Sequence, residues 1–277
     1  MLFRSAALLQ AVVDRTADLI AHWQAVGFCH GVMNTDNMSI LGLTLDYGPF
    51  QFMDAFAPGH ICNHTDVQGR YAFARQPKVA HWNLHALGQA LMALVDDADA
   101  IWAVLQTYAG QYENAWLEEI RTKLGLIESH VADLARIQDL YRWMAKQACD
   151  HTIFWRRLSH AVNDWQSGLP TNLAFAPVTD LAPQDTDLSS WLDWYRHRIS
   201  QGGRSNAGTR MLRVNPKYVL RNHMAESVIR SAQSGDFEPV RKLLRVLQNP
   251  YDEHPAHAEW ADFPPEWAQH IEISCSS

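Results

Sequence analysis

Amphipathic helical patterns cover most of the chain and constrain its fold more than any other feature. Residues 8–26 carry apolar side chains at the three- and four-residue spacing of an amphipathic helix, which Gly27 ends. From Lys78 onward the same spacing returns repeatedly, and Asp236 is expected to cap the last helix. The predicted helices cover residues 78–95, 98–108, 111–125, 128–147, 151–164, 188–200, 222–234 and 236–247, with a loop at 166–187. The sequence therefore predicts a mostly α fold.

The segment between the first helix and Lys78 has a different character. The run "SILGLTL", residues 39–45, predicts a short buried strand, and we expect it to belong to a small β-ribbon around residues 30–50. Residues 51–77 show no clear period and predict a long irregular loop, rich in aromatic residues and histidine.

Composition excludes several classes of protein. The chain has 277 residues, of which 47% are hydrophobic, and its net charge of −7 disfavours nucleic acid or an anionic membrane as a partner. No apolar run approaches the length of a membrane span, and charged residues interrupt the first helix, which argues against a signal peptide. Four cysteines lie far apart without a CxxC pair, as is typical of an intracellular protein with reduced thiols.

Polar side chains concentrate in the stretch "GFCHGVMNTDNMSILGLTLDYGPF", residues 27–50. Asn37 ends its polar loop, and Asp46 follows the apolar run and precedes Tyr47 and Gly48. Carboxylate and amide oxygens are ligands that Mg²⁺ prefers. If the segment folds back as a hairpin, Asn37 and Asp46 come close enough to share a metal ion, as in nucleotide-handling kinases.

The same stretch departs from the small-molecule kinase pattern H-G-D-x-x-x-x-N at one position. His30 matches its first residue, and Asn37 matches its metal-binding Asn. Val32 stands in place of the catalytic Asp and cannot accept a proton from a hydroxyl. A carboxylate appears instead at Asp36. Either the activity is lost, or the nucleotide is bound in a different orientation and Asp36 assists a different nucleophilic attack.

Each of these residues also has a structural interpretation. His30 is more simply a hydrogen-bonded structural histidine than a catalyst. Asn37 and Asp46 could occupy ordinary turns, and Asp36 could be a solvated loop acid. Their joint spacing is more informative than any one of them.

Longer blocks are more specific. The segments "ICNHTDVQGRYAF", "QPKVAHWNL" and "NPKYVLRNHMAESVIRSAQSGDFEPVRKLL", the terminal "SCSS" and the stretch above strongly resemble the selenoprotein O family, also called YdiU, from the first helix to the last residue. Its members are protein adenylyltransferases with a pseudokinase fold. The resemblance implies the C-terminal lobe of a protein-kinase-like fold in residues 1–150, and a family-specific helical extension and tail in residues 151–277, which could also form one compact unit with it.

The resemblance also implies an activity and roles for the loop residues. It implies transfer of AMP from ATP to Ser, Thr or Tyr hydroxyls of proteins, with Mg or Mn. The nucleotide is bound flipped, so that a kinase base at Val32 is not needed. Asp36 would accept the hydroxyl proton, Asn37 and Asp46 would bind the metal, and Asp46 would also lie near the ATP phosphates.

Two cysteines acquire a possible redox role from the same resemblance. It places Cys62 near the active site, and Cys275 stands where some members carry selenocysteine. We hypothesise a regulatory disulfide between them, and the alternative is two unrelated thiols. The other two cysteines are expected to be buried small apolar residues.

The chain lacks the nucleotide-binding motifs that the family carries in its N-terminal part. No GxGxxG and no VAIK-like strand occurs in the chain, so we expect only the C-terminal lobe, weak or inactive alone, with ATP, protein substrates and the missing N-terminal lobe as partners. The expected location is the bacterial cytoplasm. One alternative is a non-catalytic regulatory or interaction fragment with a vestigial nucleotide site. A small-molecule phosphotransferase is disfavoured by Val32.

Three other groups of residues favour structural interpretations. "HICNHTD", residues 60–66, alternates possible zinc ligands but lacks the usual separated ligand pairs. His81 and His85 lie one helical turn apart without the Glu of an HExxH motif. Lys217 and Arg221, with the neighbouring amide of residue 222, could touch phosphate, but a local structural role is favoured.

Overall fold

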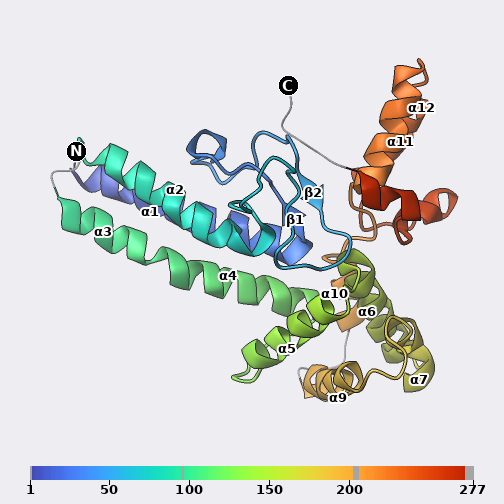
Figure 1. Ribbon diagram of the computed structural model, residues 1–277. Helices are drawn as coiled ribbons and strands as arrows, with labels where there is room; N and C mark the ends of the chain where they lie inside the picture. The colour runs from blue at the N-terminus through green and yellow to red at the C-terminus, as the bar shows by residue number, and fades with distance from the viewer. Residues whose placement is uncertain (1, 95–96, 202–205, 272–277) are drawn as a thin grey trace. The chain divides into compact units, whose positions relative to one another are not determined.

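Helices dominate the computed structural model, which describes residues 2–94, 97–201 and 206–271 (Figure 1). The α-helices are α1 (Leu2–Val26), α2 (Gln76–Leu91), α3 (Ala98–Gln106), α4 (Tyr108–Lys123), α5 (Asp133–Lys146), α6 (His151–Gln166), α7 (Thr171–Ala174), α8 (Ala176–Thr179), α9 (Thr186–Gln201), α10 (Ala207–Leu212), α11 (Asn222–Gln233) and α12 (Glu238–Leu247). Short 3₁₀ helices are η1 (Thr35–Asn37), η2 (Phe73–Arg75), η3 (Pro255–Ala261) and η4 (Glu266–His270). Strands β1 (Phe28–Cys29) and β2 (Gln51–Phe52) form a two-stranded sheet. Among the described helices, none has both the length and the apolar character needed to cross a membrane.

The mostly α prediction is confirmed, and each predicted helix has a counterpart within a few residues. The predicted cap at Asp236 is wrong by one residue, because Phe237 is the N-cap of α12; the Asp236 carboxylate still accepts a hydrogen bond from the Glu238 backbone N–H at 3.0 Å. Helices α7 and α8 lie inside the predicted loop at 166–187, and α10 was not predicted. All three are too short to produce a readable helical period.

The predicted buried strand over residues 39–45 is wrong. This segment is a turn, in which the Gly42 N–H donates to the Ser39 carbonyl oxygen at 3.1 Å and Gly42 has a φ of 69°. An antiparallel bridge between Met38 and Thr44 closes it. Its large apolar residues are exposed: Ile40, Leu41, Leu43 and Leu45. A run this short cannot both reverse the chain direction and form a ladder of hydrogen-bonded strands. Its apolar side chains therefore do not reach the hydrophobic core.

The described residues form two compact units. The first comprises residues 2–51 and 58–119, and the second comprises residues 52–57 and 120–271, apart from the residues that are not described. The predicted division at residue 150 concerns a family-specific extension and remains a prediction.

Helix α1 organises the first unit. It packs against α2 and α3, and α2 in turn packs against α3 (Figure 1). Its buried side chains recur every three or four residues, which is the spacing that predicted the helix: Leu9, Val12, Val13, Ala17, Ile20 and Trp23.

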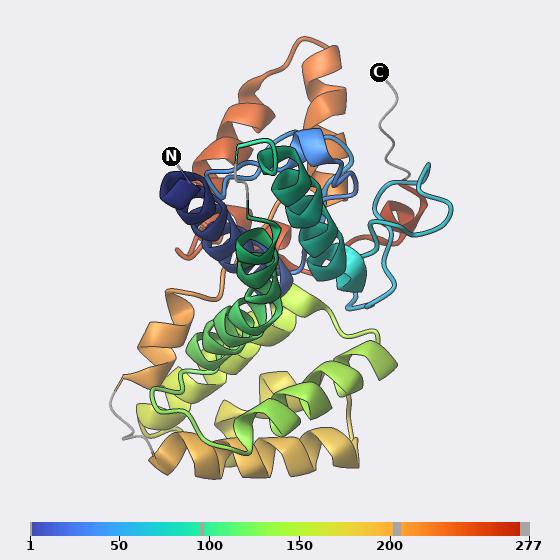
Figure 2. The same cartoon turned by 90° about the vertical axis from the view of Figure 1, so that its left-hand side faces the viewer.

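Helix α6 organises the second unit. No residue of α6 is exposed, and it packs against α7, α8 and α10. The Asp150 carboxylate caps it by accepting from the Ile153 N–H at 2.9 Å. Helices α5 and α9 lie side by side in the same unit (Figure 2), and α11 packs against α12.

Candidate active-site loop

His30 fixes the start of the candidate loop. Its Nε2 lies 2.7 Å from the carbonyl oxygen of Leu45, the residue before Asp46. The backbone N–H of Val32 donates to His30 Nδ1 at 3.4 Å, so Nδ1 is the acceptor and Nε2 carries the proton. Burial lowers the pKa of His30, against opposing effects of the Leu45 carbonyl and the Asp46 carboxylate. A neutral His30 therefore ties the two ends of the loop together, in agreement with its structural interpretation.

Gln76 anchors the same segment from the first residue of α2. Its side chain is fully buried, with Oε1 accepting from the His30 N–H at 2.9 Å and Nε2 donating to the Phe28 carbonyl oxygen at 2.9 Å. This residue was missed in the sequence analysis. A glutamine at a helix start carries no local signature, and its partners lie 46 and 48 residues away.

Gly31 occupies a position that no other residue fits. Its φ is 82°, and a Cβ there would lie 2.7 Å from Cys62 Sγ and 2.9 Å from the Pro49 carbonyl oxygen. The Asn63 amide also donates to the Gly31 carbonyl oxygen at 3.3 Å. The loop thus passes directly against Cys62 and its neighbour.

The Asn37 side chain is oriented by the loop backbone. Its Nδ2 donates to the Val32 carbonyl oxygen at 3.1 Å, which fixes the amide orientation because a carbonyl accepts only from the nitrogen. The Asn37 backbone N–H is held by the Asn34 carbonyl oxygen at 3.0 Å. Oδ1 is therefore the atom left to bind a cation.

The backbone of the segment turns sharply at Asp46. Its φ of 54° is left-handed, and its carbonyl oxygen accepts from the Gly48 N–H at 2.8 Å. Gly48, two residues later, has no positive φ. A left-handed non-glycine residue is uncommon, although Asp tolerates it, and such residues concentrate at functional sites.

The Met38–Thr44 bridge sets the register between the two halves of the loop. In antiparallel pairing the residue before one partner stands opposite the residue after the other. If this register is extended by two positions, Asp36 stands opposite Asp46. Residues 35–37 form η1, however, and do not continue a ladder. Both carboxylates are exposed.

Cys62 is buried beside Cys29. Its Sγ lies 3.4 Å from the Cys29 carbonyl oxygen, and the Cys29 thiol together with burial raises the pKa of Cys62. Cys62 is therefore a protonated thiol and a poor nucleophile at neutral pH. Cys149 is buried too, as expected. Cys275 lies outside the described residues.

The three other groups have structural partners. In residues 60–66, His60 Nε2 lies 2.9 Å from Gln51 Oε1, and the Asp66 carboxylate accepts two backbone N–H groups. Within the part of the chain that the structure describes, no cluster of three His, Cys, Asp or Glu residues could hold a metal. The His81 ring stacks on Tyr108, with ring centroids 5.1 Å apart.

The two cations singled out near residue 220 form ion pairs. Arg221 is buried in the second unit and donates to Asp54 and to both oxygens of Asp150, at 2.8 and 3.1 Å for the latter. Lys217 pairs with Glu253. These pairs support the structural interpretation of both residues.

Comparisons with known proteins bear on the loop. The family model described as "Protein adenylyltransferase SelO" matches residues 4–248. A relative named "Protein nucleotidyltransferase YdiU" from Albidiferax ferrireducens is 49% identical over 98% of the chain and 54% of its own length. Relatives with the same name from Variovorax paradoxus and Myxococcus xanthus are 50% and 48% identical, over 53% and 55% of their lengths. The chain thus spans about half the length of the curated relatives it matches.

Proposed function

Because the chain belongs to the protein adenylyltransferase SelO family, we propose that the protein transfers AMP from ATP to Ser, Thr or Tyr hydroxyls of other proteins. The observation that carries the proposal is the double closure of the candidate loop, by the His30–Leu45 hydrogen bond and the Met38–Thr44 bridge. This closure restricts how far apart Asp36, Asn37 and Asp46 can lie.

Asn37 and Asp46 fit a magnesium or manganese ion. The Asn37 amide nitrogen is already used by Val32, so its Oδ1 is available, and the exposed Asp46 carboxylate is a hard oxygen ligand. A divalent ion at this place would neutralise negative charge on the ATP phosphates during transfer. Asp46 would lie beside those phosphates.

Asp36 would act as the general base. Its carboxylate is exposed on η1, where an acceptor hydroxyl can approach it. It would take the proton of that hydroxyl as the oxygen attacks the α-phosphate. Val32 occupies the position of the base in the kinase pattern, which is consistent with transfer of AMP rather than of the γ-phosphate.

The proposal extends to the whole protein of which this chain matches about half. We infer a kinase-like lobe that carries the metal ligands and the base, with most ATP contacts supplied by the part of the relatives that the chain does not span. The isolated chain would then bind ATP weakly and transfer AMP slowly. The relatives come from bacteria, and a bacterial cytoplasmic location remains part of this proposal.

A regulatory disulfide between Cys62 and Cys275 is also proposed. Burial protects the Cys62 thiol, so the tail cysteine would have to meet it through a local opening of the loop around Gly31. Peptide mapping after oxidation distinguishes this pair from the neighbouring pair of Cys29 and Cys62. A map in which Cys62 pairs only with Cys29, or stays free, would remove the proposal.

Intact-mass and peptide mass spectrometry after incubation with ATP and Mg²⁺ tests the function. We expect AMP adducts on protein hydroxyls when the chain is fused to the half of the Variovorax relative that it does not cover. Asp36→Asn and Asp46→Asn should each abolish them. Phosphate adducts, or AMP adducts that persist in both variants, would contradict the proposal.

A further inference from the structure

A basic pocket of about 540 Å³ lies in the first unit, where the irregular loop enters α2. Arg70, Arg75 and Lys78 line it with exposed side chains, together with Trp82. Among the described residues none of the three cations forms a salt bridge. Three unpaired cations in one pocket are unexpected in a chain of net charge −7.

Neutral groups hold two of the three cations, Arg70 and Arg75, in place. The Arg75 guanidinium donates to the carbonyl oxygens of Gln68 and Gly69 at 3.0 and 2.9 Å. The Arg70 guanidinium lies 5.0 Å from the Trp82 ring centroid, a cation–π distance. The nearby Asp66 carboxylate is occupied by the backbone N–H groups of residues 70 and 71. The pocket therefore presents three cations without a salt bridge, two of them in a defined geometry.

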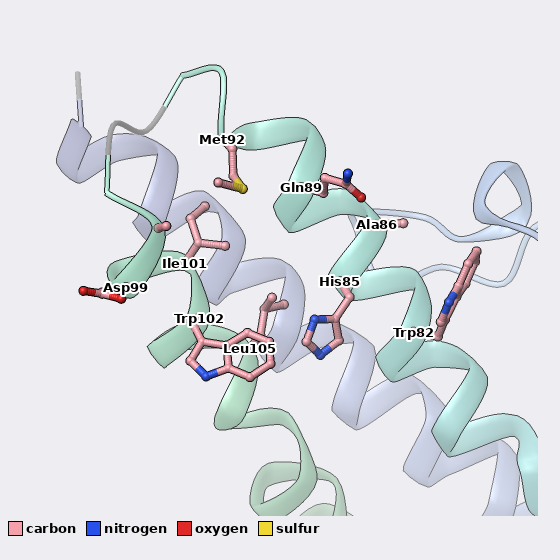
Figure 3. Close-up of a pocket in the computed structure, with 10 residues that line it drawn as sticks. Trp82, His85, Ala86, Gln89, Met92, Asp99, Ile101, Trp102 and Leu105 are labelled. Atoms are coloured by element: carbon pink, nitrogen blue, oxygen red, sulfur yellow. The ribbon is translucent and has the colours of Figure 1, made fainter.

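An apolar groove continues from the same tryptophan. It has a volume of about 480 Å³ between α2 and α3 (Figure 3). Trp82 lines both this groove and the basic pocket. Met92, Ile101, Trp102 and Leu105 supply its apolar surface. Trp102 and Met92 are exposed by 56% and 47%, a large apolar area for a surface.

The groove contains two titratable side chains, His85 and Asp99. Burial lowers the pKa of His85, whose ring centroid lies 5.3 Å from that of Trp102. Asp99 is the acidic side chain among the lining residues (Figure 3). A ligand that crosses Trp82 thus meets three positive charges on one side and apolar side chains on the other.

One hydrogen bond connects this surface to the candidate active-site loop. The Tyr71 hydroxyl donates to Asn34 Oδ1 at 2.5 Å. Tyr71 is adjacent to Arg70, and Asn34 is two residues before Asp36 in the chain. The segment that carries the basic pocket is thus linked to the candidate loop within the first unit.

We propose that the basic pocket and the apolar groove bind a segment of the acceptor protein with acidic side chains next to aliphatic or aromatic ones. This inference rests on the proposed AMP transfer and adds a recognition rule to it. Acidic side chains would pair with Arg70, Arg75 and Lys78, and apolar side chains would fill the groove. Nucleic acid fits less well, because the net charge of the chain is −7.

Fluorescence anisotropy with a labelled peptide tests the surface without ATP. The probe carries consecutive Glu residues followed by Leu and Phe, and a second probe has Lys in place of Glu. We expect the acidic probe to bind, more weakly at high salt, and the basic probe not to bind. The double variant Arg70→Glu/Lys78→Glu should weaken binding about tenfold, as should Trp102→Ser, whereas Lys242→Glu, an exposed cation on α12, should change it less than about twofold.

Three results would overturn the inference. They are equal binding of both probes, an equal loss in Lys242→Glu, and tighter binding of single-stranded oligonucleotide than of peptide. Circular dichroism checks that each variant is folded.

Transfer kinetics separate this inference from the proposed function. In the fused whole protein, with the acidic probe extended by a serine, Arg70→Glu/Lys78→Glu should raise KM about tenfold and leave kcat unchanged. An unchanged KM would contradict the docking surface while AMP transfer stands. Absence of transfer with intact peptide binding would contradict the proposed function and the acceptor role of this surface.

Discussion

At the residue scale, the candidate loop combines what the sequence could predict with what it could not. The positions of His30, Asn37 and Asp46 could be identified because their spacing matches a known metal-binding pattern. The left-handed backbone of Asp46 could not, since a positive φ is uncommon outside glycine and no local pattern marks it here. The contact between Gly31 and Cys62 was also invisible, because it joins segments that are brought together only by the fold.

Gly31→Ala should destabilise the protein strongly. The new Cβ combines a left-handed φ with contacts under 3 Å to Cys62 Sγ and the Pro49 carbonyl oxygen. We expect a loss of about 3 kcal/mol in the free energy of unfolding, measured by urea denaturation. Gly168→Ala is the matched control, since Gly168 has a φ of 102° but no atom within 4 Å of the added Cβ. Its loss should be about 1 kcal/mol, and equal losses in the two variants would contradict the role of the contact.

At the element scale, the periodicity of apolar residues was sufficient for the long helices and failed for the short elements. A helix such as α6 spans several turns, so its pattern is readable. Helices of four to six residues leave no period, and "SILGLTL" has the composition of a strand although Gly42 turns the chain in its middle. The packing of α10 on α6 depends on a single glycine, Gly208, which no local pattern marks.

Gly208→Ala should separate α10 from α6. An added Cβ would lie 2.3 Å from the backbone of Asn163 in α6, so one helix must move. We expect a loss of about 3 kcal/mol in the free energy of unfolding, measured by urea denaturation. Gly110→Ala on α4 meets no atom within 4 Å and should instead stabilise by about 0.5–1 kcal/mol. A neutral effect of Gly208→Ala would show that the two helices can repack.

At the scale of the whole molecule, buried charged and titratable groups join distant segments. Arg198 pairs with Asp133, and Arg221 pairs with Asp54 and Asp150, across 65 to 167 residues of sequence. The sequence marks these residues as charged but cannot show which of them meet. The same limit applies to the basic pocket and the apolar groove, because only the fold shows that Trp82 lines both.

Stability should fall as the pH decreases below about 6.5, the ordinary pKa of histidine. Burial holds the pKa of His151 well below that value, with smaller effects from Lys123 and Arg221. The unfolded chain therefore binds a proton that the folded chain does not, so each such histidine lowers stability by up to about 1.4 kcal/mol per pH unit. Urea midpoints at pH 7.5 and 5.5 measure the slope. His151→Gln, whose amide oxygen can accept from the Trp155 indole N–H as His151 does, should reduce it; an unchanged slope would contradict the assignment.

The most direct test of the whole account is the affinity of the chain for Mn²⁺–ATP, measured by electron paramagnetic resonance. Asn37→Ala and Asp46→Asn should each weaken binding about tenfold or more, and the double variant should lose little beyond the larger single effect. Asp36→Asn should leave binding within about twofold, because a general base does not hold the metal, and Asp252→Asn, an exposed acid in the second unit, is the control. Unchanged affinity in both Asn37→Ala and Asp46→Asn would contradict the claim that these two residues share one divalent ion.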